Sequence, residues 1–237
     1  MKLTQSIILM AISCVLTSNV NTASAQVYTV PATDNIFSAG LSTPVAPGGG
    51  GAGTLPAQIT LSSGQNAFQF QVSGTDTPNI NDPSLANLTA EGTSSWPTDL
   101  NPVGGISGYM GDYAFPLVGV FLSVTPAQAP PPPTLNFSAG AIGRNFLSLS
   151  PAIGQVFFIG NGLTDSNQAQ TFYAPAGATL LFLGLPDGYD FAGDPGQYQD
   201  NAGSLNVSVN AVPEPAPIIL LLAGSVTMAA IRYRNKR

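Results

Sequence analysis

Apolar and polar residues alternate strictly at two places in this sequence, residues 67–72 (AFQFQV) and residues 204–209 (SLNVSV). A period of two residues is that of a β-strand with one face toward a core and the other toward solvent. Short apolar runs lie between these two segments, at residues 117–124, 154–159 and 179–185. Each is bounded by Gly, Pro, Asn or Asp, and none is long enough for a typical helix. We therefore predict an all-β fold, a jelly-roll-like β-sandwich.

Glycine and proline are abundant, with 26 and 21 residues, which suits a fold with many turns. Residues 44–56 contain four consecutive glycines and are predicted to be a flexible connection. Residues 125–134 contain four consecutive prolines and are predicted to be a stiff polyproline stretch at the surface. We interpret both as loops rather than domain boundaries, so residues 26–211 are expected to form one β-sandwich domain.

The first 25 residues have the three parts of a secretory signal peptide. Lys2 is followed by an apolar stretch at residues 7–16 and by Ala23-Ser24-Ala25, an A-x-A cleavage site. We expect cleavage between Ala25 and Gln26. An alternative cut before Cys14 would make a lipoprotein. Cleavage after Ala25 removes the only cysteine, so the mature chain would depend on no disulfide.

Residues 212–237 also have three parts, in the order Val212-Pro213-Glu214-Pro215, an uncharged segment at 216–231, and a basic end. A helix over the uncharged segment would be about 24 Å long, short for about 30 Å of bilayer hydrocarbon. It has no polar stripe, which argues against an amphipathic core helix. Basic residues after it place the tail on the cytoplasmic side and the domain outside.

This C-terminal pattern resembles the PEP-CTERM sorting signal of bacteria that make extracellular polysaccharide. The motif, the apolar helix and the basic cluster occur in the same order and at the extreme C-terminus. The resemblance implies that an exosortase-type protease cuts near Pro213-Glu214-Pro215. It also implies an exported protein, membrane-anchored in transit and then located at the cell surface or in the extracellular matrix.

The predicted mature domain is strongly acidic. Eleven of the twelve acids but only Arg144 among the bases fall between Gln26 and Ala211, which gives this segment a net charge of −10. A chain without clustered Lys and Arg is not suited to bind the phosphates of nucleic acid. Acidity favours cations, or simply keeps an extracellular protein soluble. Asp34, close to the new N-terminus, is expected to be an ordinary solvated acid.

Four acids gather late in the chain, at Asp187, Asp190, Asp194 and Asp200, and Asn201 follows the last. Such clustering is relieved either by exposure of turn residues to water or by a cation. Calcium binds carboxylate, amide and carbonyl oxygens, whereas the absence of His argues against zinc or copper. The spacing is not that of an EF-hand.

The stretch PAGATLLFLGLPD…PGQYQDNAGSLNVSV resembles the end of the galactophilic lectins of the PA-I type, which are small calcium-dependent β-sandwiches. Asp187 falls on an Asp that closes the equivalent strand in those lectins. Residues 195–204 (PGQYQDNAGS) fall on a Pro-Gly-x-Tyr-x-Asn-Asn-x-Gly-Ser segment before the last strand. The matching stretch is about a quarter of the domain, with a weaker match at residues 114–121.

The resemblance implies calcium held by the side chains of Asp187, Asp200 and Asn201 and by the backbone carbonyl of Gln197. A further carbonyl would come from the loop after an early strand, expected at residues 74–77. A sugar would bind the calcium through two hydroxyls and also touch Asp187 and Asp200. Three features depart from the family: a longer loop after Asp187, Asp200 in place of an Asn, and the absence of the His that selects galactose.

Trp96 is the only tryptophan, and it suits stacking on a sugar and packing under a loop equally well. No nucleophile–base pair is visible, because residues 26–211 contain no His, Cys or Lys. We therefore predict a non-enzymatic, exported protein that binds calcium and associates with extracellular polysaccharide or a galactose-like glycan. One alternative is a structural matrix protein in which calcium only stabilises a loop. A second is a glycoside hydrolase that pairs Asp187 with Asp200 or Asp112.

Overall fold

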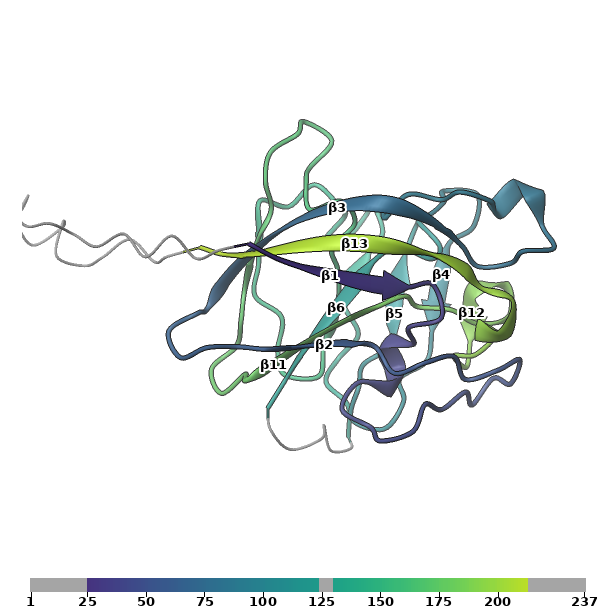
Figure 1. Cartoon of the computed structure of the whole chain (residues 1–237), viewed down its shortest axis with the longest axis horizontal. Helices are drawn as coiled ribbons and strands as arrows, with labels where there is room; N and C mark the ends of the chain where they lie inside the picture. The colour runs from purple at the N-terminus through teal and green to yellow at the C-terminus, as the bar shows by residue number, and fades with distance from the viewer. Residues whose placement is uncertain (1–24, 124–129, 213–237) are drawn as a thin grey trace, which may run out of the picture.

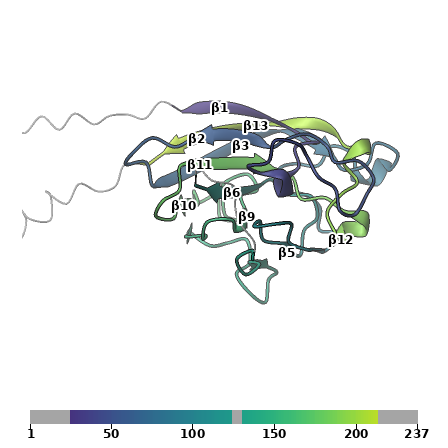
Figure 2. The ribbon, with the colours of Figure 1, turned by 90° about the horizontal axis from the view of Figure 1, so that it is seen from below.

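The computed structural model describes residues 25–123 and 130–212. These residues form thirteen β-strands and four short 3₁₀-helices, and the strands fall into three sheets. The prediction of an all-β fold is confirmed, and the two larger sheets stack in a sandwich-like arrangement (Figure 1; Figure 2). The 3₁₀-helices are η1 (Ile36–Ser38), η2 (Pro83–Leu85), η3 (Tyr189–Phe191) and η4 (Tyr198–Asp200).

The largest sheet is built around the two strands whose alternation is clearest in the sequence. Its order is β1 (Gln26–Pro31), β13 (Ala202–Ala211), β3 (Ala67–Thr77), β10 (Thr171–Tyr173) and β8 (Ser148–Leu149). β13 runs antiparallel to β3 over its whole length and to β1 over residues 204–209. Leu205, Val207 and Val209 of β13 are buried, and the polar residues between them face away from the core. The sequence alternation is therefore the in-and-out pattern of this sheet.

The second sheet contains the three apolar runs. Its order is β2 (Ala57–Thr60), β11 (Leu180–Gly184), β6 (Val118–Leu122) and β9 (Val156–Phe158), with antiparallel neighbours throughout. Every residue of β6 and β9 is buried. A strand that is covered on both faces has no polar side, so it appears in a sequence as a continuous apolar run.

Aromatic rings join the two large sheets. The ring of Phe121 on β6 lies 6.0 Å from that of Phe68 on β3, between centroids, and 5.1 Å from that of Phe157 on β9. Phe172 on β10 lies 5.4 Å from Phe157. Such pairs add about 0.5–1.5 kcal/mol each to the free energy gained from burial. Apart from Ala67 and Tyr198, the buried apolar residues of the described segments, 25–123 and 130–212, belong to one cluster.

A third, small sheet has the order β12 (Ala192–Gly193), β4 (Thr98–Leu100), β5 (Tyr109–Gly111) and β7 (Asn136–Phe137). β12 pairs in parallel with β4, with Ala192 opposite Asp99 and Gly193 opposite Leu100. This pairing attaches the acidic segment after β11 to the middle of the chain.

Arg144 is the one basic residue in the part of the chain that the structure describes. Its guanidinium pairs with the carboxylate of Glu91 and lies 3.7 Å from the centroid of the Tyr113 ring. Burial raises the pKa of Glu91, while a hydrogen bond from the Asn161 backbone and the charge of Arg144 oppose this rise. The arrangement ties three separate loops together.

Both ends of the described domain lie at the same end of the largest sheet (Figure 1). The predicted cleavage position lies at the start of β1: Ala25 precedes the strand, and Gln26 is its first residue. Val212 follows β13, and its backbone N–H donates to the carbonyl of Ala67 at 2.8 Å.

Several predictions fall on residues that the structure does not describe. These are residues 1–24 of the signal peptide, Pro213, Glu214 and Pro215 of the sorting motif, and the apolar and basic segments after them. Of the predicted polyproline stretch, residues 130–134 are described and contain no helix or strand. Within the described ranges, no helix has the length and apolarity needed to span a membrane.

Candidate metal and ligand site

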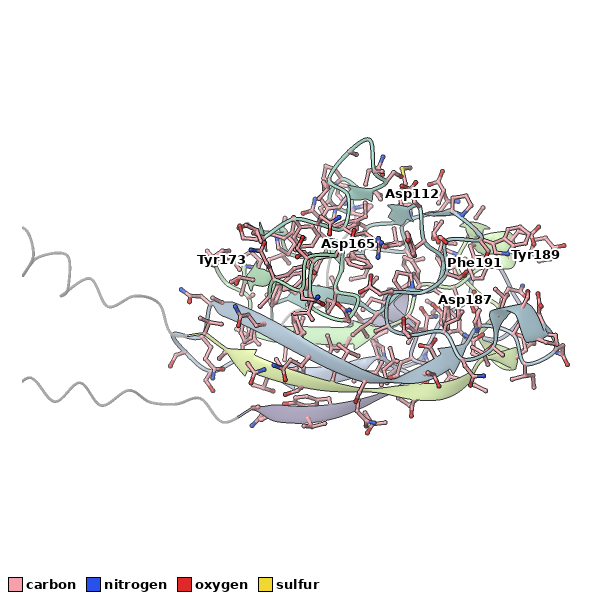
Figure 3. All side chains as sticks on the ribbon, turned by 90° about the horizontal axis from the view of Figure 1, so that it is seen from above. Asp112, Asp165, Tyr173, Asp187, Tyr189 and Phe191 are labelled. Atoms are coloured by element: carbon pink, nitrogen blue, oxygen red, sulfur yellow. The ribbon has the colours of Figure 1, made fainter. Side chains whose placement is uncertain are left out.

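A cavity of about 200 Å³ opens at the end of the molecule opposite to the chain ends. Its walls come from the loop after β3, from Trp96 ahead of β4, and from residues 187–200 between β11 and β13. Figure 3 labels Asp187, Tyr189 and Phe191 at this end of the molecule, far from Tyr173. The segment that the sequence singled out for its acids therefore borders a cavity.

Asp187 is the most deeply buried acid of this cavity, with 2% of its surface exposed. It follows β11, and its Oδ1 accepts a hydrogen bond of 2.8 Å from the backbone N–H of Gly188. Its Oδ2 has no hydrogen-bond partner among the described residues. Burial raises the pKa of the Asp187 carboxyl well above its usual range. The nearby Asn201 side chain and the N–H of Gly188 oppose the rise, and the charge of Asp200 adds to it. A buried carboxylate with a free oxygen is costly unless something positive meets it.

Asp200 and Asn201 supply two more free oxygens beside Asp187. Asp200 ends η4, and Asn201 leads directly into β13. The Asn201 amide donates to the carbonyl of Ala32 at 3.1 Å, which orients the side chain. The Oδ1 atoms of both residues are buried and lack a partner within the described part of the chain. Three side-chain oxygens of neighbouring residues are thus desolvated and unsatisfied, although buried polar groups are normally paired.

Tyr198 connects the two halves of this cluster. It is completely buried, and its hydroxyl donates to the carbonyl of Leu185 at 2.8 Å while accepting from the N–H of Asp187 at 3.2 Å. The end of β11 is therefore fixed to η4, so Asp187 is held at Asp200 and Asn201 by hydrogen bonds within the protein.

Gln197 precedes η4 and lines the same cavity. Its backbone is left-handed, with φ 70° and ψ 15°, a conformation that is uncommon for residues other than glycine and that concentrates at functional sites. The structure thus places Asp187, Gln197 and Asp200 in the lining of one cavity, and Asn201 directly follows Asp200.

The glycine run at residues 48–51 is not the flexible connection predicted from its composition. It packs along residues 194–199, and a Cβ on Gly48 would lie 2.2 Å from the carbonyl oxygen of Asp194. Only glycine permits such close approach of two backbones. Four backbone hydrogen bonds join the segments: Gly48 N to Pro195 O, Gln197 N to Gly49 O, Gln199 N to Gly50 O and Tyr198 N to Gly51 O.

The expectation of a loop at residues 74–77 is wrong, because these residues form the end of β3. The loop begins one residue later, and Pro78 and Asn79 line the cavity. The backbone N–H of Ile80 donates to the carbonyl of Asp200 at 2.9 Å, which holds this loop against η4. The strand continues further because its partner β13 pairs with it up to Thr77.

The donor set suits a hard cation. Carboxylate and amide oxygens are ligands that calcium prefers, and no His occurs anywhere in the chain. Within the described ranges, no group of three or more His, Cys, Asp and Glu side chains gathers around a metal position. Here the set is two carboxylates and one amide, and the unpaired oxygens of Asp187, Asp200 and Asn201 are the observation that fits calcium.

An aromatic rim borders the same cavity and was not assigned to the site from the sequence. Trp96 and Tyr189 are 43% and 70% exposed, whereas Phe191 is buried at 6%. The rings of Trp96 and Phe191 lie 6.5 Å apart between centroids. The sequence does show that Trp96 is the only tryptophan and precedes a proline. Trp96 is far from Asp187 in the chain, so the sequence did not indicate that both line one cavity.

Three other acids do not join the cluster. Asp112 lines a separate cavity with Arg144 and Asp165, so the structure does not place it in one pocket with Asp187 (Figure 3). Asp194 accepts a hydrogen bond of 2.8 Å from Asn101. Asp190 lines the cavity but is solvent-exposed.

Asp34 is not the solvated acid that its position near the N-terminus suggested. It is 5% exposed, and its Oδ1 accepts a 2.8 Å hydrogen bond from the hydroxyl of Thr54. Burial raises the pKa of Asp34 to about 6. The reason is that β1 and η1 are integral parts of the domain, so the chain around residue 34 is enclosed by later segments.

Comparisons with protein-family models, with curated proteins and with solved structures found no match to this chain.

Proposed function

We propose that this chain is an exported calcium-binding protein that associates with carbohydrate through the cavity at Asp187. The observation that carries the proposal is the trio of buried, unpartnered oxygens on Asp187, Asp200 and Asn201. A divalent cation among them would satisfy all three oxygens and offset the repulsion between two carboxylates.

Calcium takes six to eight oxygen ligands, so three side chains leave room for others. We assign the carbonyl of Gln197 and one carbonyl of the Pro78–Asn79 loop as further ligands, since both segments line the cavity. The remaining positions would be open to water or to sugar hydroxyls. The resemblance to galactophilic lectins supports hydroxyl binding at Asp187 and Asp200, and the departures from that family leave the identity of the sugar open.

The ends of the chain extend this proposal to location. A signal peptide removed after Ala25 would leave Gln26 at the start of β1, so the domain loses no strand. A PEP-CTERM tail would begin at Val212, directly after β13. We therefore propose processing by an exosortase-type protease and delivery of a jelly-roll-like domain to the cell surface or extracellular matrix. Mass spectrometry of the mature protein tests this: peptides extending through Ile231 in the surface form contradict it.

Two alternative functions remain within reach of experiment. The cation would connect the end of β11, η4 and the loop after β3, which also suits a structural matrix protein in which calcium only stabilises these loops. A glycan array probed with and without EDTA separates the two readings. Asp187 and Asp200 share a cavity, which is the arrangement a glycoside hydrolase would need. That activity would require sugar turnover that Asp187→Asn abolishes.

A calcium titration of the purified protein tests the proposed function directly. Binding to the folded state alone stabilises by about 2.7 kcal/mol when calcium is at about a hundred times its Kd. For a domain of this size, that corresponds to a rise in Tm of roughly 5–11 °C. Asn201→Ala should abolish the rise. Asp99→Asn, which removes an exposed charge outside the cavity, should leave it intact. Equal Tm values in calcium and in EDTA for the unmodified protein contradict the proposal.

A further inference from the structure

Two large aromatic side chains stand at the rim of the cavity with much of their surface exposed. Trp96 is 43% exposed and Tyr189 is 70% exposed, and both line the cavity that contains Asp187. The third aromatic residue of the rim, Phe191, is buried and lies under Trp96. Phe191 contributes to the packing of the domain because it is buried. Packing does not explain why large parts of Trp96 and Tyr189 are exposed to solvent.

The backbone around Tyr189 is strained in a way that sets these orientations. Asp190 and Phe191 both adopt left-handed conformations, with φ of 50° and 56°. Each such residue costs roughly 1–2 kcal/mol, and two in succession are unusual for residues other than glycine. The strained turn sends Phe191 inward and leaves Tyr189 outward (Figure 3).

The turn is held by hydrogen bonding on both sides. The N–H of Phe191 donates to the carbonyl of Gly188 at 3.0 Å, and β12 follows at once and pairs in parallel with β4. Trp96 comes just before β4, as Tyr189 comes just before β12. Because residues preceding two paired parallel strands emerge at the same end of the pair, this small sheet places Trp96 and Tyr189 on one rim.

Charge restricts what the cavity can take. Its lining includes four acids, at Asp82, Asp187, Asp190 and Asp200, and no base. One calcium ion would leave a net negative charge. This negative charge would repel an anionic ligand such as a uronic acid, whereas it would not repel a neutral sugar.

Size restricts the ligand further. A volume of about 200 Å³ is below the range of roughly 300–1,000 Å³ that is typical for drug-sized ligands. The cavity therefore suits one sugar ring, with the rest of a chain outside it.

We propose that Trp96 and Tyr189 form the aromatic wall of a subsite for a single neutral hexopyranose ring, in an inference that rests on the proposed function. The ring would present its apolar C–H face to the aromatic rim, where the negative face of the π-system attracts the C–H groups. Its hydroxyls would point to Asp187, Asp200 and the cation. The acidic lining favours neutral pyranoses. The long loop after Asp187, in which this chain departs from the lectins it resembles, supplies Tyr189 to the wall, and the segment ahead of β4 supplies Trp96.

The test uses Trp96 as its own reporter, because the chain has no other tryptophan. In millimolar calcium, the purified protein is titrated with the methyl glycosides of galactose, glucose and mannose and with galacturonic acid. Tryptophan emission and acrylamide quenching are recorded. We expect at least one neutral glycoside to shift the emission and protect Trp96 from quenching, and galacturonic acid to do neither.

Variants separate this inference from the proposed function. Trp96→Ala and Tyr189→Ala should each weaken binding of that glycoside about tenfold by calorimetry. Both should retain the calcium-induced rise in Tm, and Tyr173→Ala, an exposed tyrosine at the opposite end, should change neither property. Unchanged Trp96 fluorescence with every glycoside, or binding that survives Trp96→Ala, overturns the aromatic subsite even where calcium raises Tm. Loss of the calcium response in the unmodified protein overturns the proposed function instead.

Discussion

Replacing Asp187 by Asn should have opposite effects on stability in the absence and in the presence of calcium. In the metal-free protein, the carboxylate is 2% exposed and its Oδ2 is unpaired. Asn keeps the oxygen that accepts from Gly188 N–H, removes the charge, and adds an NH₂ group beside the free Oδ1 atoms of Asp200 and Asn201. The variant should therefore fold more stably than the original in EDTA.

The magnitudes follow from the environment of the side chain. A buried polar group without a partner costs about 1–3 kcal/mol, so Asp187→Asn should gain roughly 2 kcal/mol in EDTA. That is about 4–8 °C in Tm for a domain of this size. Calcium at about a hundred times its Kd should add about 2.7 kcal/mol to the original protein and nothing to the variant. The advantage of the variant should then vanish or reverse.

Urea denaturation at neutral pH, in EDTA and in calcium, measures both effects on the same two proteins. Asp99→Asn is the matched control, because it removes the same charge from an exposed position on β4. Its free energy of unfolding should differ little from that of the original in either condition. A loss of stability in EDTA for Asp187→Asn would refute the reasoning, since it would mean that the carboxylate is a satisfied structural acceptor rather than an unmet ligand.

Three further predictions concern other groups of the domain. Burial raises the pKa of Asp76 from 3.8 to about 8, so the folded state holds a proton that the unfolded state releases; stability should fall by up to about 1.4 kcal/mol per pH unit between pH 4 and 8. Denaturation in EDTA across this range should show a shallower slope for Asp76→Asn, and equal slopes would contradict the assignment. Gly48→Ala places a Cβ 2.2 Å from Asp194 O and should weaken calcium binding at least tenfold, whereas Gly140→Ala, with open space around it, should not; isothermal titration checks both. Arg144→Met leaves Glu91 partly buried without its cation and should cost about 3–5 kcal/mol in urea, whereas Arg144→Lys should cost less because it keeps the charge but loses the stack on Tyr113.

The sheets were predictable from the sequence where one physical rule decides the pattern. The alternation at residues 204–209 predicts a half-buried strand, and it forms β13, which lies between β1 and β3 in the largest sheet. The apolar run at 117–124 was predictable as a core strand because both faces of β6 are covered. The clustering of acids drew attention to residues 187–200, and the resemblance to the lectins then selected Asp187, Asp200 and Asn201.

The errors arose where the deciding partner is distant in the chain. Four consecutive glycines have the composition of a flexible linker, and only residues 194–199 make them a close-packed backbone segment. Asp34 is buried by Thr54 and by residues after β11, which its local sequence does not reveal. Trp96 contacts Phe191 because β4 pairs with β12. β12 has only two residues, so no pattern in the sequence indicates this strand.

β13 has a mechanical consequence. Its ten residues, about 33 Å of extended chain, run from the turn that carries Asn201 to the residue before Val212. Under the proposed function, the glycan is held at one end of this strand and the sorting tail begins at the other. A pull between them acts along the strand axis, against the ladders to β1 and β3 on both sides. Hydrogen bonds loaded in this direction must break together rather than one after another. β13 separates the cavity from the tail, and it would therefore transmit tension from one end of the domain to the other without unfolding the domain.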